Sequence, residues 1–241
     1  MKKIIKKIKK IIKAKIYKTA YSNYSENSYG RVARITDEEY RKDLISWQIP
    51  AIKKHFGDLT DKSFIDVGAG DIVLGEFLFE IGIPRTFYAQ DLSEISLKVG
   101  IDRIKKSKIN PDIFVTMSSD NFDFSKVEDF ELDFAFSNSL FSHLSINSIL
   151  LCLRKLSNKM KIGGKYFTSM IVLPSSKEEE SFDWSYLENK YTDVTSHSTK
   201  DPFHYSKETI KNLSSFNTGF KFIKIHDYGH PFQKLVEFER I

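Results

Sequence analysis

A glycine-rich turn is the first feature of this chain whose residue types could do chemistry. Asp66 stands before it and Gly68, Ala69 and Gly70 form it, between an apolar run at 63–67 and a helical pattern. Glycine lets a backbone turn tightly and approach a ligand without interference from a Cβ atom. The helix that follows offers free backbone N–H groups at its start. This combination predicts a ligand site at the carboxyl edge of a parallel sheet.

A second acid, Asp91, comes 21 residues after Gly70, at the end of the next apolar run. A carboxylate there can accept hydrogen bonds from both hydroxyls of a ribose. The alternative is that Asp91 caps the next helix, and the two roles are compatible. Dinucleotide enzymes prefer Gly-x-Gly-x-x-Gly in such a turn. Here Val73 takes the place of the third glycine, and the next glycine is Gly75.

The order of these residues resembles motif I of class I S-adenosylmethionine-dependent methyltransferases, which is often written (Asp/Glu)-x-Gly-x-Gly-x-Gly. The spacing of the last glycine departs from that pattern. The resemblance implies that S-adenosylmethionine is the cofactor, that Asp91 binds its ribose, and that Leu92 packs on its adenine. It also assigns to the cofactor site the residues of the turn: Asp66, Gly68, Ala69 and Gly70.

A third segment, Ser-Ser-Asp-Asn at 118–121, extends the resemblance. It resembles the family's motif whose acid meets the adenine amine. The resemblance therefore implies that Ser119, Asp120 and Asn121 bind the cofactor.

Three further segments bring the resemblance to about residues 60–240. The strand and loop at 133–144 resemble the family's fourth motif, which implies that Ser137 and Asn138 bind the cofactor. Residues 161–166 resemble its Lys-Pro-Gly-Gly turn, with isoleucine in place of proline, and residues 229–236 resemble the end of bacterial members. The order and spacing of the motifs carry the resemblance more than any single motif does.

The expected reaction needs few catalytic groups. A sulfonium methyl group is already activated, so the enzyme mainly aligns it with a nucleophile. A hydroxyl acceptor also benefits from a general base. The candidates are His143 after the fourth strand, for which packing or capping is the alternative, and His204 with Tyr205. His230 is a third candidate base, which we rank below the others because we expect it at the opposite edge of the sheet. The spacing of histidines and acids indicates no metal site.

The elements that must position these residues alternate between strand and helix. Strands are expected at 63–67, 86–90, 113–117, 132–137, 166–173, 220–226 and 233–239. Helices are expected at 36–55, 72–81, from 93, at 145–160, where Gly163-Gly164 follows, and at 207–215. The alternation predicts an α/β fold, a doubly wound, seven-stranded, mostly parallel Rossmann-like sheet of the methyltransferase type, with an antiparallel last strand.

The chain divides into three regions. Residues 1–18 place isoleucines at helical spacing between lysines, which predicts a cationic amphipathic helix. Residues 19–60 are expected to form an N-terminal helical cap, and residues 61–241 the methyltransferase domain. Within that domain, residues 174–205 are charged, aromatic and without a clear period, which indicates an insertion over the acceptor site.

The net charge of +5 belongs to the N-terminal region. Residues 1–18 hold nine lysines and no acid, so the remainder has 28 Lys+Arg against 32 Asp+Glu, a charge of −4. An acidic body disfavours a nucleic-acid partner. The lysine-rich helix predicts binding to an anionic membrane surface, with a protein partner or its own domain as the alternatives.

The compartment expected from the sequence is the cytoplasm, with a peripheral place at the inner membrane face. A single cysteine, Cys152, excludes an internal disulfide. No apolar run approaches the roughly 18 residues of a spanning helix. No apolar stretch or cleavage site of a secretory signal follows the cationic start.

The function expected is methyl transfer to a small polar acceptor, first of all to a hydroxyl of a sugar or surface-polysaccharide precursor. The fourth strand ends in Ser-Asn-Ser, not in the Asn/Asp-Pro-Pro-Tyr run of amino methylases acting on bases. Two alternatives stay open. One is a nucleic-acid-binding methyltransferase that uses the lysine-rich tail, and the other is a non-catalytic scaffold with the same fold.

Overall fold

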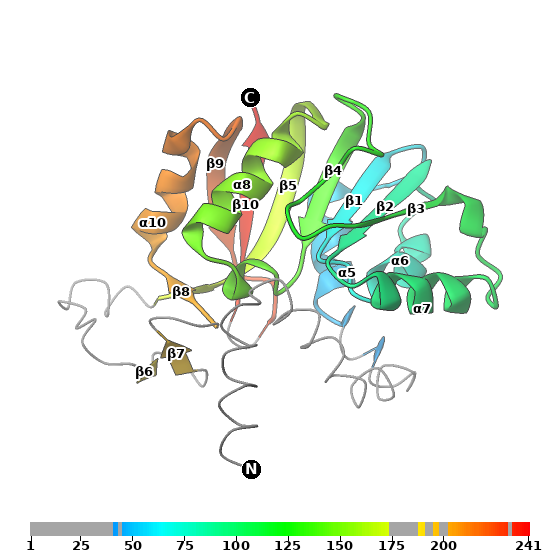
Figure 1. Cartoon of the computed structure of the whole chain (residues 1–241), viewed down its shortest axis with the longest axis horizontal. Coiled ribbons are helices and arrows are strands. Elements are labelled where there is room, and N and C mark those ends of the chain that lie inside the picture. The colour runs from blue at the N-terminus through cyan, green and yellow to red at the C-terminus, as the bar shows by residue number, and fades with distance from the viewer. Residues whose placement is uncertain (1–40, 43–44, 174–187, 191–194, 198–201, 231–232) are drawn as a thin grey trace, which may run out of the picture.

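The computed structural model describes residues 41–42, 45–173, 188–190, 195–197, 202–230 and 233–241. The expectations for residues 1–18, and for most of 19–60 and of the insertion 174–205, concern residues outside these ranges. One large sheet organises the described part of the chain (Figure 1).

The strands of the large sheet are β1 (Ser63–Val67), β2 (Thr86–Asp91), β3 (Phe114–Ser118), β4 (Leu132–Ser137), β5 (Met160–Val172), β8 (His204–Tyr205), β9 (Phe220–His226) and β10 (Lys234–Arg240). Their order is β3-β2-β1-β4-β5-β10-β9, with β8 beside β5. The pairs from β3 to β5 are parallel, and β10 is antiparallel to both its neighbours. The predicted seven-stranded sheet with an antiparallel last strand is confirmed, and the short β8 is an addition to it.

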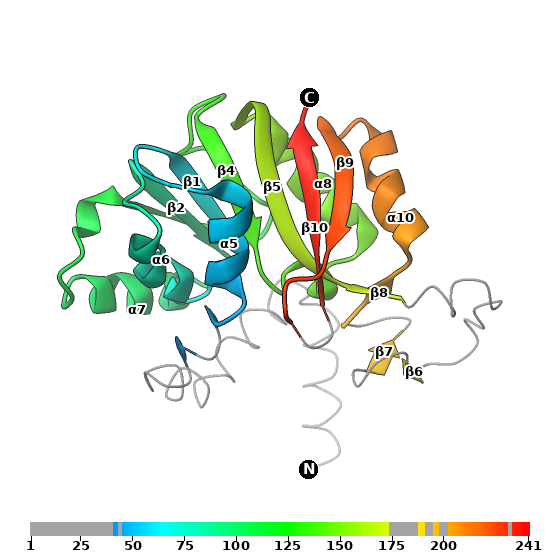
Figure 2. The same ribbon diagram turned by 180° about the vertical axis from the view of Figure 1, so that it is seen from behind.

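Helices cover both faces of the sheet. Their bounds are α5 (Gln48–Phe56), α6 (Val73–Phe77), α7 (Glu94–Ile104), α8 (Ile146–Ser157) and α10 (Lys207–Asn212). Figure 1 shows α8 and α10 in front of the sheet, and Figure 2 shows α5, α6 and α7 on the opposite face. Each face has its own hydrophobic cluster, so the parallel strands are buried on both sides, as their continuous apolar runs require.

The helix expected at 36–55 is interrupted. Ser46 and Trp47 lie in a turn, and α5 begins only at Gln48. Pro50 explains the break, because a proline has no N–H for the carbonyl of Ser46 and its ring would clash with that carbonyl. The first turn of a new helix tolerates proline, since its N–H groups have no intrahelical partners.

Gly163 and Gly164 lie inside a strand and do not separate a helix from a strand as expected. β5 already begins at Met160, and its register against β4 slips before Phe134, which pairs with Lys165. Extra residues of β5 bulge out of the ladder at this point. Gly163 has a φ of +76°, a conformation that glycine adopts without the penalty of a Cβ atom.

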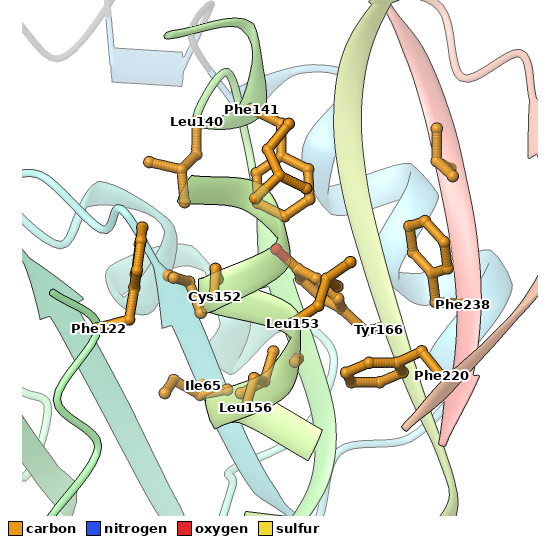
Figure 3. Close-up of a cluster of buried hydrophobic side chains, with 14 of the residues drawn as sticks. Ile65, Phe122, Leu140, Phe141, Cys152, Leu153, Leu156, Tyr166, Phe220 and Phe238 are labelled. Carbon is orange, nitrogen blue, oxygen red and sulfur yellow. The ribbon is translucent and has the colours of Figure 1, made fainter. Parts of the chain in front are cut away.

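The core on the α8 side is built from long apolar side chains of both layers (Figure 3). Cys152, Leu153 and Leu156 of α8 pack toward the sheet, where Tyr166 of β5 and Phe238 of β10 meet them, and all five are fully buried. Cys152 is a free thiol, and burial raises its pKa. The thiol of Cys152 therefore serves the packing of the core.

The insertion contributes three short strands to the described residues. β6 (Glu188–Lys190) and β7 (Thr195–His197) pair antiparallel, and β8 runs parallel to the end of β5. Both views place these strands at the lower end of the sheet, where the parallel strands finish (Figures 1 and 2). Within the described ranges, no helix has the length and apolar character needed to cross a membrane.

Candidate functional site

The glycine turn connects β1 to α6 at the carboxyl edge of the sheet. The N–H groups of Gly68 and Ala69 both donate to the carbonyl of Gln90, at 2.8 and 2.9 Å, which ties the turn to the end of β2. Gly68 has a φ of +79°, and a Cβ atom there would lie 3.1 Å from Cδ1 of Leu140. Gly70 has a φ of +53°, and no atom lies within 4 Å of where its Cβ would stand. The turn is therefore packed behind Gly68 and open at Gly70.

Asp91 links the two loops that follow β1 and β2. Its Oδ2 accepts a hydrogen bond from the N–H of Gly70 at 2.9 Å, and its Oδ1 accepts one from Ser93 at 2.8 Å. Ser93, and not Asp91, is the N-cap residue of α7, because its hydroxyl accepts from the N–H of Ser96. Burial raises the pKa of Asp91, although these backbone hydrogen bonds oppose the shift.

Asp66 lies deeper than Asp91. It is 5% exposed, and burial together with the nearby charge of Asp91 raises its pKa to about 8. No group of the described residues donates a hydrogen bond to its carboxyl. Burial and the charge of Asp91 both disfavour the charged form of Asp66, and a positively charged ligand nearby would oppose that effect.

A cavity of about 410 Å³ opens beside these loops, a size that suits a small-molecule ligand. Eight residues expected at the site line it: Gly68, Asp91, Leu92, Ser119, Asp120, Asn121, Asn138 and His143. Six residues that were not predicted to bind also line it: Gln90, Phe122, Ser139, Leu140, Leu144 and Ser148. These residues come from the ends of β2, β3 and β4 and from the start of α8.

The wall that follows β3 is held by Ser119. Its hydroxyl accepts from the N–H groups of Asn121, at 3.2 Å, and Asp123, at 2.8 Å, and its carbonyl accepts from Nε2 of Gln90 at 3.0 Å. Gln90 is 2% exposed, so its amide orients this loop from within the core. Its place directly before the expected ribose-binding acid was the sequence signal that could have identified it.

Four residues assigned to the cofactor do not line the cavity, and one of them is the buried Asp66. Ala69 and Gly70 lie beside it in the turn. Ser137 is fully buried, and its hydroxyl bonds to the hydroxyls of Tyr166, at 2.9 Å, and Thr168, at 2.7 Å. Its side chain faces the buried core on the α8 side, where Tyr166 lies, and this position disfavours contact with the cofactor.

His204 and Tyr205 also lie outside the cavity lining. The hydroxyl of Tyr205 donates to the carbonyl of Leu144, and the N–H of Phe203 donates to the carbonyl of Ser142 at 2.7 Å. These contacts make β8 a support for η3 (Phe141–His143). His204 is 8% exposed, and burial lowers its pKa to about 4. Of the expected catalytic residues, His143 is the one that lines the cavity.

The turn between β9 and β10 lies at the same edge as the cavity, so the placement of His230 at the opposite edge was wrong. β9 runs parallel to the central strands, and its carboxyl end therefore reaches the edge at which they end. Tyr228 donates to Oδ1 of Asn138 at 3.2 Å, and Nε2 of Gln233 donates to the hydroxyl of Ser139 at 2.9 Å. Burial lowers the pKa of His230 to about 4.

Three of the six described non-glycine residues with positive φ lie around the site. Ile72, Phe122 and Ser139 have φ values of 60°, 57° and 57°, a region that residues with a Cβ atom seldom adopt. Ile72 begins the helix after the glycine turn, and the other two line the cavity. Such strain persists where the surroundings impose it and is concentrated at binding sites. The described residues hold no group of three or more His, Cys, Asp or Glu arranged to bind a metal ion.

The strand order and the cavity at the carboxyl edge define the class I methyltransferase fold. The geranyl diphosphate C-methyltransferase of Streptomyces coelicolor A3(2), solved with Mg²⁺, geranyl diphosphate and S-adenosyl-L-homocysteine, has a TM-score of 0.59 and 14% identity over 85% of this chain and 83% of its own. A SAM-dependent methyltransferase from Aquifex aeolicus has a TM-score of 0.59 and 16% identity over 85% of this chain and 99% of its own.

A candidate O-methyltransferase from Nostoc punctiforme has a TM-score of 0.61 and 14% identity over 83% of this chain. This chain spans 57% of the length of that protein. No family model and no curated protein matches the sequence. At these identities the similarity to solved structures establishes the fold.

Proposed function

We propose that this protein is an S-adenosylmethionine-dependent methyltransferase that acts on a small polar acceptor. The observation that supports it most is the contact of Asp91 with the N–H of Gly70, which joins the two loops at one end of the cavity. Two oxygens of a carboxylate offer about four lone-pair sites. Asp91 therefore retains acceptor capacity for ribose hydroxyls after it binds Gly70 and Ser93.

The charges of the site fit this cofactor. Asp66 is buried, Asp91 is partly buried, both have raised pKa values, and Asp120 lies on the cavity wall. When bound, S-adenosylmethionine supplies a methyl group on a positively charged sulfur. A cationic ligand favours the charged forms of the nearby carboxyls, which burial alone disfavours.

His143 is the residue we propose as general base. It lies in η3, which Tyr205 and Phe203 of the neighbouring segment support from behind. A base held on such a support can accept the proton of an acceptor hydroxyl while the cavity walls align that hydroxyl for in-line attack.

The acceptor we propose is a hydroxyl of a sugar or of a surface-polysaccharide precursor. Among the described residues that line the cavity there is no Lys or Arg, and Asn138, Ser139 and Ser148 offer it amide and hydroxyl groups. Such a wall suits a neutral polar group. A diphosphate, as in the Streptomyces enzyme, would meet no cationic side chain on these walls.

The placement we propose is cytoplasmic, at the inner face of a membrane, with residues 1–18 as the contact to anionic lipid. The nine lysines of this segment support it, and the charge of −4 over the rest of the chain disfavours nucleic acid.

Calorimetry with S-adenosylhomocysteine tests the cofactor. We expect saturable binding at micromolar concentrations to the full chain. If S-adenosylhomocysteine at high micromolar concentration gives no heat of binding, the methyltransferase proposal is wrong and the scaffold alternative remains.

A transfer assay tests the acceptor. Labelled S-adenosylmethionine is incubated with pools of cellular metabolites, and products are separated by charge. The proposal predicts label in neutral or nucleotide-linked sugars as an ether that survives mild base. Label released by mild base, or found in nucleic acid, would contradict it.

A further inference from the structure

Ser139 lines the cavity and receives a hydrogen bond from a buried amide. It follows β4, lines the cavity, and has a φ of 57°. Its N–H donates to Oγ of Ser169 at 2.6 Å, and its carbonyl accepts from Oγ of Ser142 at 3.1 Å. Both backbone groups are therefore engaged, which leaves the hydroxyl as the group of Ser139 that can serve a ligand.

The direction of the surrounding hydrogen bonds is fixed by the backbone. Oγ of Ser169 accepts from the N–H of Ser139 and donates its own proton to Oε1 of Gln233. The amide of Gln233 is thereby oriented, and its Nε2 donates to Oγ of Ser139 at 2.9 Å. Ser169 and Gln233 are 0% and 4% exposed, so water does not compete for these bonds.

The consequence concerns the proton of the Ser139 hydroxyl. Its oxygen accepts from Gln233, and Nδ2 of Asn138 also points at it from 3.4 Å. No described residue accepts the proton in return, and the side chain lines the cavity. The proton is thus available to a ligand. Tyr228 orients Asn138 in a similar way. Its hydroxyl donates to Oδ1 of Asn138, which directs the Nδ2 donor of that amide toward Ser139.

We propose that Ser139 donates a hydrogen bond to an oxygen of the bound ligand, and that Gln233, in the last hairpin, is a positioning residue that turns this donor into the cavity. The inference rests on the proposed function. The ligand oxygen is a carbonyl, carboxylate or hydroxyl oxygen, and it belongs either to the amino-acid end of the cofactor or to the acceptor.

Two variants remove the donor in different ways. Ser139→Gly deletes the hydroxyl and also relieves the positive φ, so it should fold at least as well as wild type. Gln233→Glu keeps the hydroxyl but replaces a donor with a carboxylate that accepts its proton, which turns Ser139 away from the cavity. Ser214→Ala is the matched control. The hydroxyl of Ser214 accepts a hydrogen bond from the backbone N–H of Phe222 at 2.6 Å, and Ser214 does not line the cavity.

Binding of S-adenosylhomocysteine and of 5′-methylthioadenosine, which lacks the amino-acid end, is measured by calorimetry, and label transfer into a metabolite pool is measured in parallel. If the oxygen is the cofactor carboxylate, both variants weaken S-adenosylhomocysteine about tenfold and leave methylthioadenosine unchanged. If it belongs to the acceptor, both ligands bind as in wild type and transfer falls about tenfold. Either pattern supports the proposal.

Three results would overturn it. Equal weakening of both ligands would indicate general distortion of the cavity, and unchanged binding and transfer would indicate that the donor has no ligand. A loss in Ser139→Gly without one in Gln233→Glu would remove the positioning role. A wild-type protein that binds no S-adenosylhomocysteine is a separate outcome, which concerns the proposed function itself.

Discussion

At the scale of single residues, two carboxyls with different surroundings lie at the ends of neighbouring strands. Asp91 reaches the cavity and is held by backbone N–H groups on both oxygens. Asp66 is buried behind it without such donors among the described residues. The difference separates a ligand-binding role, which belongs to Asp91, from an electrostatic one, which belongs to Asp66.

Substitution of Asp91 should weaken the cofactor product. We expect Asp91→Asn to weaken the binding free energy of S-adenosylhomocysteine by about 1–3 kcal/mol, because hydrogen bonds to a charged acceptor are lost. Methylthioadenosine should weaken equally, since it shares the ribose. Wild-type affinity should also fall as the pH drops through the raised pKa of Asp91, and the variant should lose this dependence. Calorimetry across pH measures both, and Asp112→Asn, an exposed acid, is the control.

Asp66 should make stability depend on pH in the direction opposite to most carboxyls. Its pKa is 3.8 when unfolded and about 8 in the fold, so the folded state holds the proton more tightly. Its contribution is fully favourable below about pH 4 and is lost as the pH rises toward about 8. Asp66→Asn should flatten that loss in ligand-free protein, as measured by urea denaturation at several pH values. An unchanged pH slope would mean that Asp66 is charged in the fold.

At the scale of elements, α7 is fastened to the glycine turn. Arg103 of α7 bonds to Oδ2 of Asp71 at 2.7 Å and to its carbonyl at 2.6 Å, and it also bonds to Glu76. Glu76 is shared with Arg41, which precedes α5. A Cβ atom on Gly100 would lie 2.3 Å from the same Asp71 carbonyl, so α7 packs directly on the turn.

Arg103→Gln should loosen this fastening. We expect a loss of about 2 kcal/mol of stability, because buried acids lose a charged partner, and severalfold weaker binding of S-adenosylhomocysteine. Chemical denaturation and calorimetry measure the two effects. Arg85→Gln is the comparison, since its ion pair with Glu131 is half exposed and should contribute less than about 1 kcal/mol. Equal effects of the two substitutions would refute the role of the α7 contact.

At the scale of the whole molecule, the lysine-rich segment and the residues that line the cavity belong to different parts of the chain. Residues 1–18 carry nine lysines, whereas the rest has a charge of −4 and contains the cavity. Membrane attachment and cofactor binding should therefore be independent properties.

Removal of residues 1–18 should test this independence. We expect the shortened chain to lose flotation with anionic liposomes and to keep its affinity for S-adenosylhomocysteine. For the full chain, flotation should decline as salt screens the lysines. Flotation that persists without residues 1–18, or binding of the full chain to RNA in preference to liposomes, would contradict the proposed membrane contact.

The seven main strands, most of the helices and the two acid-bearing loops were predictable from the sequence, because period, glycine position and strand length are local signals. Eight of the expected site residues line the cavity for this reason. Pro50 could have indicated the break before α5, but the helical period of the flanking residues predicted a continuous helix.

The residues that contact the end of β4 come from distant parts of the chain and were not predictable from the sequence. Gln233 and Tyr228 lie 94 and 90 residues from Ser139 and Asn138 in the chain, and no local pattern marks them. In the structure, Ser137, His204 and Tyr205 lie outside the cavity, where Ser137 and Tyr205 hydrogen-bond to neighbouring strands and loops. The physical reason is that the direction of β9 fixes which edge its turn reaches, and packing of buried groups fixes which side chains are left to face a ligand.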